Sequence, residues 1–288
     1  MMKSLEPTLA EQGVLAVLVL YRCEPDEAAS WPVLCSWLDT KDDRSLRHCL
    51  VYDNSPSPSH KEDWSEGISF ISNPSNGGTA GAYAAASDRA AQLGCKWLLL
   101  LDQDTMLPAA YLERAQEAIS RAPDAAALVP LVLHGDQPIS PAIIDALGSV
   151  KPCERPDQKD GIVTAISSGV LIRREIMAAI DFPKQIWLDY VDHWLFLNLN
   201  RKGAVFAYID AKLVHDLSVR APRSLSSFRL RSILAAEERF YREIGGKALT
   251  MMPLRRLLRA FRYLRVGRPG LATTVLKTFV LPGSAVKP

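Results

Sequence analysis

The chain has 288 residues, 48% of them hydrophobic and 23% charged, which is typical of a globular protein with a sizeable core. Its length allows one large domain, or one domain with an appendage. Five cysteines without a CxxC pair argue against a disulfide framework or a zinc site, so we expect a reducing, cytoplasmic setting. The apolar run 13–20 is short and lacks a cleavage site, which favours a buried strand over a signal peptide, and no stretch is long enough to cross a bilayer.

The first half of the chain alternates between apolar strands and helices. The strands lack apolar–polar alternation, which is typical of a parallel sheet covered on both faces. We therefore expect an α/β fold with a Rossmann-like, mostly parallel central sheet and helices on both faces. Strands are predicted at 14–21, 46–55, 68–74 and 96–104, and helices at 27–38, 79–94 and 108–123.

The second half is less regular. Strands are predicted at 126–133 and 204–210, and the segment 163–180 predicts a strand that runs into a helix. From residue 224 onward the chain has helical character. Residues 247–288 carry nine basic side chains and no acidic one, so the rest of the chain carries a net charge of −7 against a total of +2. This asymmetry points to an anionic partner for the end of the chain.

Two aspartates, Asp102 and Asp104, follow the apolar residues of the strand predicted at 96–104. Ligands of an open parallel sheet bind outside the carboxyl ends of its strands, and alternate residues of an extended segment point the same way. Two carboxylates that reach one point, with room for water and phosphate, describe a site for Mg²⁺ or Mn²⁺ on a diphosphate. A solvated strand end is the alternative.

The same strand end fits a second chemistry. Phosphatases of the haloacid dehalogenase type present an aspartyl nucleophile, here Asp102, on an apolar strand that ends in DxDxT. In this chain the threonine comes one place early and at least three strands precede the motif. Lys184, Asp189 and Asp192 match the other positions of such a phosphatase poorly.

Two further segments of the first half suggest a ligand site. Asp53 and Asn54 end another predicted strand, where a carboxylate could accept a hydrogen bond from a pyrimidine imide or a ribose hydroxyl. An Asx turn is the alternative. The glycine-rich turn 73–83 leads into a helix but is neither GxGxxG nor a P-loop. Its small residues allow either close approach of a ligand or tight helix packing.

The second half offers three candidate groups. A substrate could lie against Gly169 in the small turn 167–169, or this glycine serves backbone geometry alone. The apolar stretch 186–203 holds Asp192 and its neighbours; a carboxylate beside apolar walls can act as a base, whereas aspartates at a helix N-terminus also favour the helix dipole. His215 ends a predicted strand, where a histidine is either a metal ligand or structural.

The order of these segments is more specific than any one of them. The motifs YDNS, NGGTAG, DQD, SSGVLI, LDYVD and VHD follow one another along the chain. Together they resemble the family 2 glycosyltransferases with the GT-A fold, and most closely the bacterial rhamnosyltransferase-like branch. The resemblance covers about 14–218. It implies a GT-A domain over 1–223, with a nucleotide-sugar half over about 1–123 and an acceptor half over about 124–223, followed by a basic helical extension over 224–288.

The resemblance implies a role for each candidate residue. Asp102 and Asp104 look like the DxD motif that holds the divalent metal and the diphosphate, His215 looks like a further metal ligand, and Asp192 looks like the catalytic base. The residues implied in nucleotide binding are Tyr21, Asp53, Asn76, Gly77 and Gly78. The residues implied in the donor and acceptor pocket are Gly169, Trp187, Asp189 and His193.

The implied reaction is an inverting displacement. Asp192 would take a proton from an acceptor hydroxyl, which attacks the anomeric carbon while the metal stabilises the leaving nucleoside diphosphate. The first donor that we expect is dTDP-rhamnose, ahead of UDP-sugars or a galactofuranose donor. The acceptor would be a saccharide or a lipid-linked saccharide of bacterial surface polysaccharide, such as O-antigen. The chain departs from the family pattern at four positions, Ala84, Ala86, Trp194 and Asn198. These departures indicate an unusual donor or acceptor.

The segment 253–268 predicts a basic amphipathic helix, with four leucines and Phe261 at helical spacing among arginines. Such a helix suits an anionic membrane surface, which would place the protein peripherally at the inner face of the cytoplasmic membrane. The alternative is that the leucines pack on the core and the arginines are solvated. Nothing else in the sequence supports a nucleic-acid partner, and the oligomeric state stays open. A non-catalytic, membrane-associated module with the same fold is a further alternative.

Overall fold

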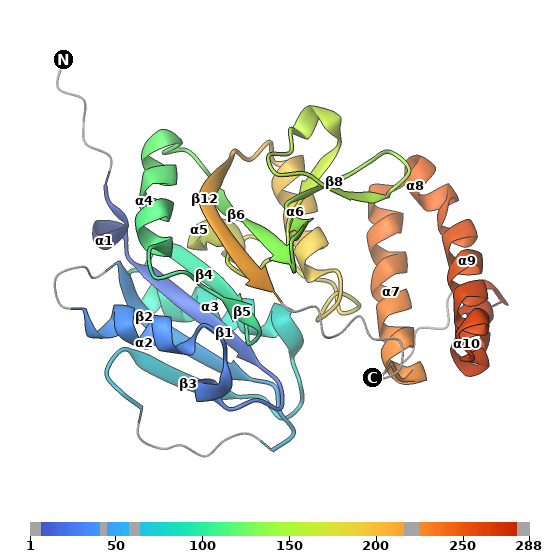
Figure 1. Ribbon diagram of the computed structural model, residues 1–288, viewed down its shortest axis with the longest axis horizontal. Helices are drawn as coiled ribbons and strands as arrows, with labels where there is room; N and C mark the ends of the chain where they lie inside the picture. Colours follow the sequence, from blue (N-terminus) through green and yellow to red (C-terminus); the bar gives the residue numbers. More distant parts are fainter. Residues whose placement is uncertain (1–6, 41–44, 58–63, 216–224, 281–288) are drawn as a thin grey trace.

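The computed structural model describes residues 7–40, 45–57, 64–215 and 225–280. Within these residues a nine-stranded central sheet has the order β3-β2-β1-β4-β11-β6-β12-β5, and β7 pairs with β6 (Figure 1). The strands are β1 (Val14–Leu20), β2 (Leu46–Asp53), β3 (Ile68–Ser72), β4 (Trp97–Asp102), β5 (Thr105–Met106), β6 (Ala127–His134), β7 (Gln137–Ser140), β11 (Leu171–Arg173) and β12 (Phe206–His215).

The sheet is mostly parallel, as expected. The first four strands of the order run parallel to one another, and so do β6 and β12. The exceptions are the short strands: β11 lies antiparallel between β4 and β6, β5 is antiparallel to β12, and β7 is antiparallel to β6.

The apolar run of β4 shows no alternation because its side chains are buried on both faces of the sheet. Leu98 and Leu100 belong to the core cluster on one face of the sheet, with side chains of α3 and α6. Leu99 and Leu101 belong to the cluster on the other face, with side chains of α2 and α4. Asp102 continues the row of Leu98 and Leu100, so its side chain is directed to the side of α3 and α6. The bounds of the flanking helices are α2 (Trp31–Asp39), α3 (Gly78–Gln92), α4 (Tyr111–Arg121), α5 (Arg174–Ala178) and α6 (Val191–Arg201).

A second, three-stranded antiparallel sheet packs on α6, and sequence patterns did not reveal it as a sheet. The side chain of Asn200 on α6 acts as an additional partner for this sheet. Its Oδ1 accepts from the amide of Val163 at 3.0 Å and its Nδ2 donates to the carbonyl of Val163 at 2.8 Å. The strands are β8 (Ala142–Ile144), β9 (Val150–Pro152) and β10 (Ile162–Thr164), and the short helices elsewhere are α1 (Leu9–Gln12), η1 (Pro25–Glu27) and η2 (Gln158–Asp160).

The end of the chain is helical, as expected, and forms a separate layer beside the sheet (Figure 1). Helix α7 lies nearest to the sheet, and its Phe240 and Tyr241 join the core cluster that contains α6. Helices α7, α9 and α10 enclose a core of their own, built from Leu230, Leu234, Ala260, Leu271, Ala272 and Val275. The helices are α7 (Ser227–Ile244), α8 (Gly246–Thr250), α9 (Met252–Arg265) and α10 (Pro269–Val280).

In the part of the chain that the structure describes, no helix is both long enough and apolar enough to cross a membrane.

Candidate functional site

The candidate site lies at the carboxyl end of β4. The strand ends at Asp102, and Gln103 and Asp104 form a turn rather than the extended segment that the sequence predicted. After this turn, β5 pairs with the end of β12. The carboxylate of Asp104 nevertheless lies close enough to that of Asp102 to raise its pKa. The two aspartates are thus brought together by a turn and not by strand alternation.

A second carboxylate reaches Asp102 from α6. Asp102 keeps some exposure as a residue, but its carboxyl group is desolvated, and this desolvation is the main reason why its pKa rises to about 8. The charge of Asp192, in the first turn of α6, is the next cause, followed by that of Asp104. Three of the predicted residues, from two segments far apart in the sequence, therefore share one small region.

Tyr83 of α3 completes this group, although the sequence did not single it out. Its ring is 1% exposed and its hydroxyl donates to Ser167 Oγ at 2.6 Å. Burial raises the pKa of Tyr83 well above its usual range, and the charges of Asp102 and Asp192 raise it further. The phenol therefore stays protonated, and its one proton is donated to Ser167.

The turn 167–169 holds the end of β4 in place. Ser168 Oγ accepts from the amide of Asp102 at 2.9 Å and is hydrogen-bonded to the hydroxyl of Thr105. The amide of Gly169 donates to the carbonyl of Leu100 at 2.6 Å. Gly169 has φ +87°, and an added Cβ would lie 2.2 Å from Leu213 Cδ1. Of the two readings of Gly169, the structure therefore favours backbone geometry.

The glycine-rich turn brings the nucleotide-side candidates next to Trp187. Asn76 and Gly78 both have positive φ, of 55° and 65°. An added Cβ on Gly78 would lie 2.3 Å from the carbonyl oxygen of Trp187, which accepts from the amide of Ala80 at 3.0 Å. Gly77 lies in the same way against the side chain of Asn73. The small residues therefore allow the start of α3 to pack tightly against the segment before α6.

Asp53 and Tyr21 end the neighbouring strands β2 and β1. Asp53 is 2% exposed and its Oδ1 accepts from the amide of Ser55 at 2.8 Å, which is the Asx turn considered above. Tyr21 is 43% exposed, with the guanidinium of Arg22 5.2 Å from its ring centre. The amide of Tyr21 donates to Gln103 Oε1 at 2.8 Å, so the residue between the two aspartates ties β1 to the DxD turn.

Asp189 and His193 are engaged by neighbouring elements. Burial raises the pKa of Asp189, against the effect of Arg229 of α7, whose guanidinium forms a bidentate ion pair with this carboxylate. His193 Nδ1 lies 2.8 Å from Thr164 Oγ1, and burial lowers the pKa of the ring to about 4. Both side chains flank Asp192 along the chain and connect its segment to α7 and to β10.

His215 is described only in its backbone, which lies opposite Thr105 in the pairing of β12 with β5. This register brings His215 beside the DxD turn, while its side chain falls outside the described part of the structure. Among the described residues, no group of three or more His, Cys, Asp or Glu side chains is placed to hold a metal ion. The role of His215 as a metal ligand therefore stays a prediction.

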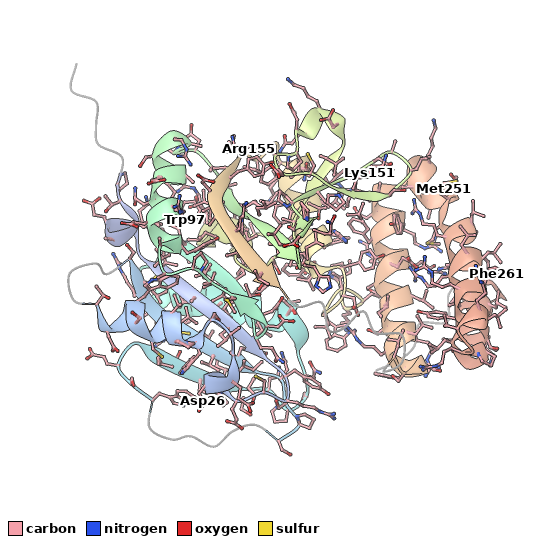
Figure 2. All side chains as sticks on the ribbon, in the orientation of Figure 1. Asp26, Trp97, Lys151, Arg155, Met251 and Phe261 are labelled. Carbon is pink, nitrogen blue, oxygen red and sulfur yellow. The ribbon has the colours of Figure 1, made fainter. Side chains whose placement is uncertain are left out.

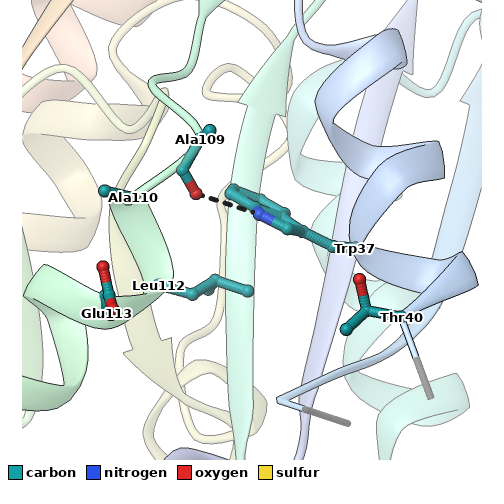
Figure 3. Close-up of a pocket in the computed structure, with 6 residues that line it drawn as sticks. All are labelled: Trp37, Thr40, Ala109, Ala110, Leu112 and Glu113. Atoms are coloured by element: carbon teal, nitrogen blue, oxygen red, sulfur yellow. Dashed lines mark hydrogen bonds between the residues drawn. The ribbon is translucent and has the colours of Figure 1, made fainter. Parts of the chain in front are cut away.

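A small pocket of about 150 Å³ lies elsewhere, between α2 and α4 (Figure 3). The indole nitrogen of Trp37 closes one side of it by donating to the carbonyl of Ala109 at 3.1 Å. None of the candidate site residues lines this pocket, which is formed by Trp37, Thr40, Ala109, Ala110, Leu112 and Glu113.

No protein-family model and no curated protein matches this chain. Its structure is similar to the crystal structure of GalNAc-T7 with UDP, GalNAc and Mn²⁺, with a TM-score of 0.52 and 13% sequence identity. The match covers 80% of this chain but only 50% of that one, so this chain corresponds to about half the length of its neighbour. At this identity the likeness establishes the fold alone. The protein has the GT-A fold, as the motifs predicted.

Proposed function

We propose that this protein is a metal-dependent glycosyltransferase, which moves a sugar from a nucleotide donor to a hydroxyl group of an acceptor. The observation that carries the proposal is that Asp104 and Asp192 lie close enough to Asp102, at the carboxyl edge of a GT-A sheet, for their charges to act on it. The structural neighbour holds UDP, GalNAc and Mn²⁺ on the same fold, which supports a nucleotide-sugar donor and a saccharide acceptor.

The donor atoms at the site suit Mg²⁺ or Mn²⁺. Asp102 and Asp104 offer hard oxygen ligands, and desolvation, followed by the charges of Asp192 and Asp104, raises the pKa of Asp102. A divalent cation bound here would supply positive charge that offsets both these carboxylates and a diphosphate. His215 is the further ligand that we propose, on the basis of the backbone register beside the DxD turn.

We assign proton transfer, nucleobase binding and pocket formation to residues around the site. Asp192 would take the proton of the acceptor hydroxyl, and the freed oxygen would displace the nucleoside diphosphate from the anomeric carbon with inversion. The exposed ring of Tyr21 offers a stacking surface for the nucleobase. Asp53 would need a local opening to reach the base or the ribose, because its side chain is buried. Trp187 would contribute to the donor and acceptor pocket, whereas Gly169 would hold the turn that fixes the end of β4.

The finer identity of the reaction rests on the sequence motifs. We propose dTDP-rhamnose as the first donor to test, with UDP-sugars beside it because the structural neighbour holds UDP. A saccharide or lipid-linked acceptor of bacterial surface polysaccharide is the matching acceptor. Transfer from dTDP-rhamnose would support assignment of the protein to the rhamnosyltransferase-like branch of the family 2 glycosyltransferases.

The test is turnover of nucleotide sugars by the full chain with Mn²⁺ or Mg²⁺, measured as release of nucleoside diphosphate with and without saccharide acceptors. We expect activity that needs the metal, and NMR of the product should show an inverted anomeric configuration. Asp192→Asn should abolish transfer and keep nucleotide binding, whereas Asp88→Asn, an exposed aspartate of α3, should change neither.

Three results would contradict the proposal. Normal sugar transfer by the Asp192→Asn variant would contradict the role of Asp192 as the base. Nucleotide affinity without turnover on any donor and acceptor would favour the non-catalytic module. A phosphoryl group trapped on Asp102 would favour the phosphatase alternative, in which this residue is the nucleophile.

A further inference from the structure

Helix α9 turns its leucines outward, and Arg256 and Arg259 inward. Phe261 and Leu258 are 60% and 61% exposed, whereas Arg256 is 3% exposed. The alternative in which the leucines pack on the core and the arginines are solvated is therefore wrong for this helix. We call the exposed apolar row of α9 the outer stripe; it consists of Leu254, Leu257, Leu258, Phe261 and Leu264.

Acidic residues of α7 explain this orientation. Glu237 is 2% exposed, and its carboxylate accepts from Arg259 Nη2 at 2.7 Å and lies 3.6 Å from Arg256 Nε. Arg256 also donates to the carbonyl of Leu234 at 3.0 Å and lies 3.4 Å from Glu238. A buried carboxylate without its partners is strongly destabilising. Rotating α9 to bury its leucines would leave Glu237 in that state, so the ion pairs hold the outer stripe at the surface.

The outer stripe is apolar and its surroundings are positive. Contiguous exposed apolar patches on soluble proteins mark interaction sites. Arg262 and Arg265 are exposed on α9, and Lys277 is exposed on α10, which also exposes Leu276 and Phe279. The sequence has no acidic residue from 247 to 288. Figure 2 shows Phe261 on the outer side of the helical layer, away from the central sheet.

We propose that the outer stripe docks on an anionic phospholipid surface. Helix α9 lies in the plane of the interface, its leucines and Phe261 enter the boundary between headgroups and acyl chains, and Arg262 and Arg265 contact lipid phosphates. Charge decides between this occupant and a second copy of the chain. An isologous contact would bring the positively charged surroundings of two outer stripes together without acidic partners, which is unfavourable, whereas an anionic bilayer complements the same charge.

The test is co-sedimentation of the full chain with vesicles of phosphatidylcholine, alone or mixed with phosphatidylglycerol. We expect binding to the mixed vesicles and little binding to phosphatidylcholine alone. Leu258→Gln and Phe261→Gln should each lower the partition coefficient by roughly tenfold or more, from the transfer of one large apolar side chain. Arg265→Gln should lower it about fivefold, and salt should weaken the wild-type binding.

Matched controls lie on the sheet domain. Val205 is 50% exposed before β12, and Arg121 is exposed at the end of α4, so Val205→Gln and Arg121→Gln remove an apolar and a basic side chain far from α9. Both controls should bind like the wild type. Circular dichroism melting should show all five variants folded, since each substitution is at an exposed position.

Three outcomes would overturn the proposal. If the wild type bound phosphatidylcholine vesicles as strongly as the mixed vesicles, the binding would not require anionic lipid. If the Phe261→Gln variant bound the mixed vesicles as strongly as the wild type, the outer stripe would not be the membrane contact. A wild-type dimer that becomes a monomer in Phe261→Gln by light scattering, with no binding to vesicles, would identify a second copy of the chain as the occupant. None of these readouts depends on sugar transfer, so the proposed function can fail independently.

Discussion

Arg229 of α7 donates from both of its terminal nitrogens to the carboxylate of Asp189, which lies three residues before Asp192. The pair is largely buried, with side chains 29% and 18% exposed. Trp187 donates to Ser232 of the same helix at 3.3 Å. The segment that leads to the proposed base is therefore fixed to α7 at two points, and the C-terminal helices support the site.

We expect Arg229→Ala to destabilise the protein by about 1–3 kcal/mol, below the cost for a fully buried pair because both side chains retain some exposure. Transfer should fall more than nucleotide binding, because the loosened segment carries Asp192. Arg231→Ala, at an exposed position of the same helix, is the matched control and should be silent. Additive effects of Arg229→Ala and Asp189→Ala in a double-mutant cycle would mean that the ion pair contributes nothing.

Gly78→Ala should weaken nucleotide binding. The new Cβ would lie 2.3 Å from the carbonyl oxygen of Trp187, so the start of α3 and the segment before α6 must move apart. Gly94→Ala is the control, because Gly94 has a similar φ of +67° but nothing within 4 Å of the added Cβ. Both variants carry the cost of a left-handed residue, about 1–2 kcal/mol. Titration calorimetry should show a loss of affinity for Gly78→Ala alone, and equal affinities would contradict a role for this close approach.

Ser168→Ala should disturb the proposed metal site. The substitution leaves the amide of Asp102 without its acceptor and removes the hydrogen bond to Thr105, which should cost about 1–3 kcal/mol of stability. Since Asp102 ends β4 at this point, we also expect weaker Mn²⁺ binding. The control is Ser120→Ala, whose hydroxyl donates to a carbonyl within α4 and is exposed. Mn²⁺ affinity that is unchanged in Ser168→Ala would show that the turn 167–169 does not position the ligand.

The stability of the metal-free protein should fall as the pH rises. The pKa of Asp102 is raised from 3.8 to about 8 in the folded state, so between these values the folded protein binds more protons than the unfolded chain. The contribution of Asp102 is thus fully present below pH 3.8 and is lost as the pH rises through about 8. Asp102→Asn should melt at a higher temperature than the wild type at pH 8, and the difference should shrink at pH 5.

Added Mn²⁺ should reverse this trend, because a carboxylate binds metal only when deprotonated. The rise in melting temperature on adding Mn²⁺ should therefore be larger at pH 8 than at pH 6 in the wild type and small in Asp102→Asn. An Asp102→Asn variant with the same dependence of melting temperature on pH as the wild type would show that another group controls it.

Much of the fold was predictable because its main strands are buried on both faces. The runs that became β1 and β4 are apolar at nearly every position, and Gly94 ends α3 after the alanine-rich stretch. The short antiparallel strands were not predictable in the same way. Strand β11 is three residues long and follows the turn at Gly169, where an added Cβ would meet Leu213 of a distant strand.

The candidate site was predictable in its residues but not in its geometry. Asp102, Asp104 and Asp192 meet, yet the turn at Gln103 and the supporting roles of Tyr83, Ser168 and Arg229 depend on contacts between distant segments. The orientation of α9 was undecided for a similar reason. A basic amphipathic helix can bury either side, and only the partner helix with Glu237 determines which side is inside.

Helix α7 is shared between the proposed membrane contact and the proposed chemistry. Phe240 packs on His193 of α6, with ring centres 5.6 Å apart, and Glu237, three residues earlier on α7, binds arginines of α9. Variants that loosen α7 should therefore weaken both the proposed vesicle binding and the proposed sugar transfer.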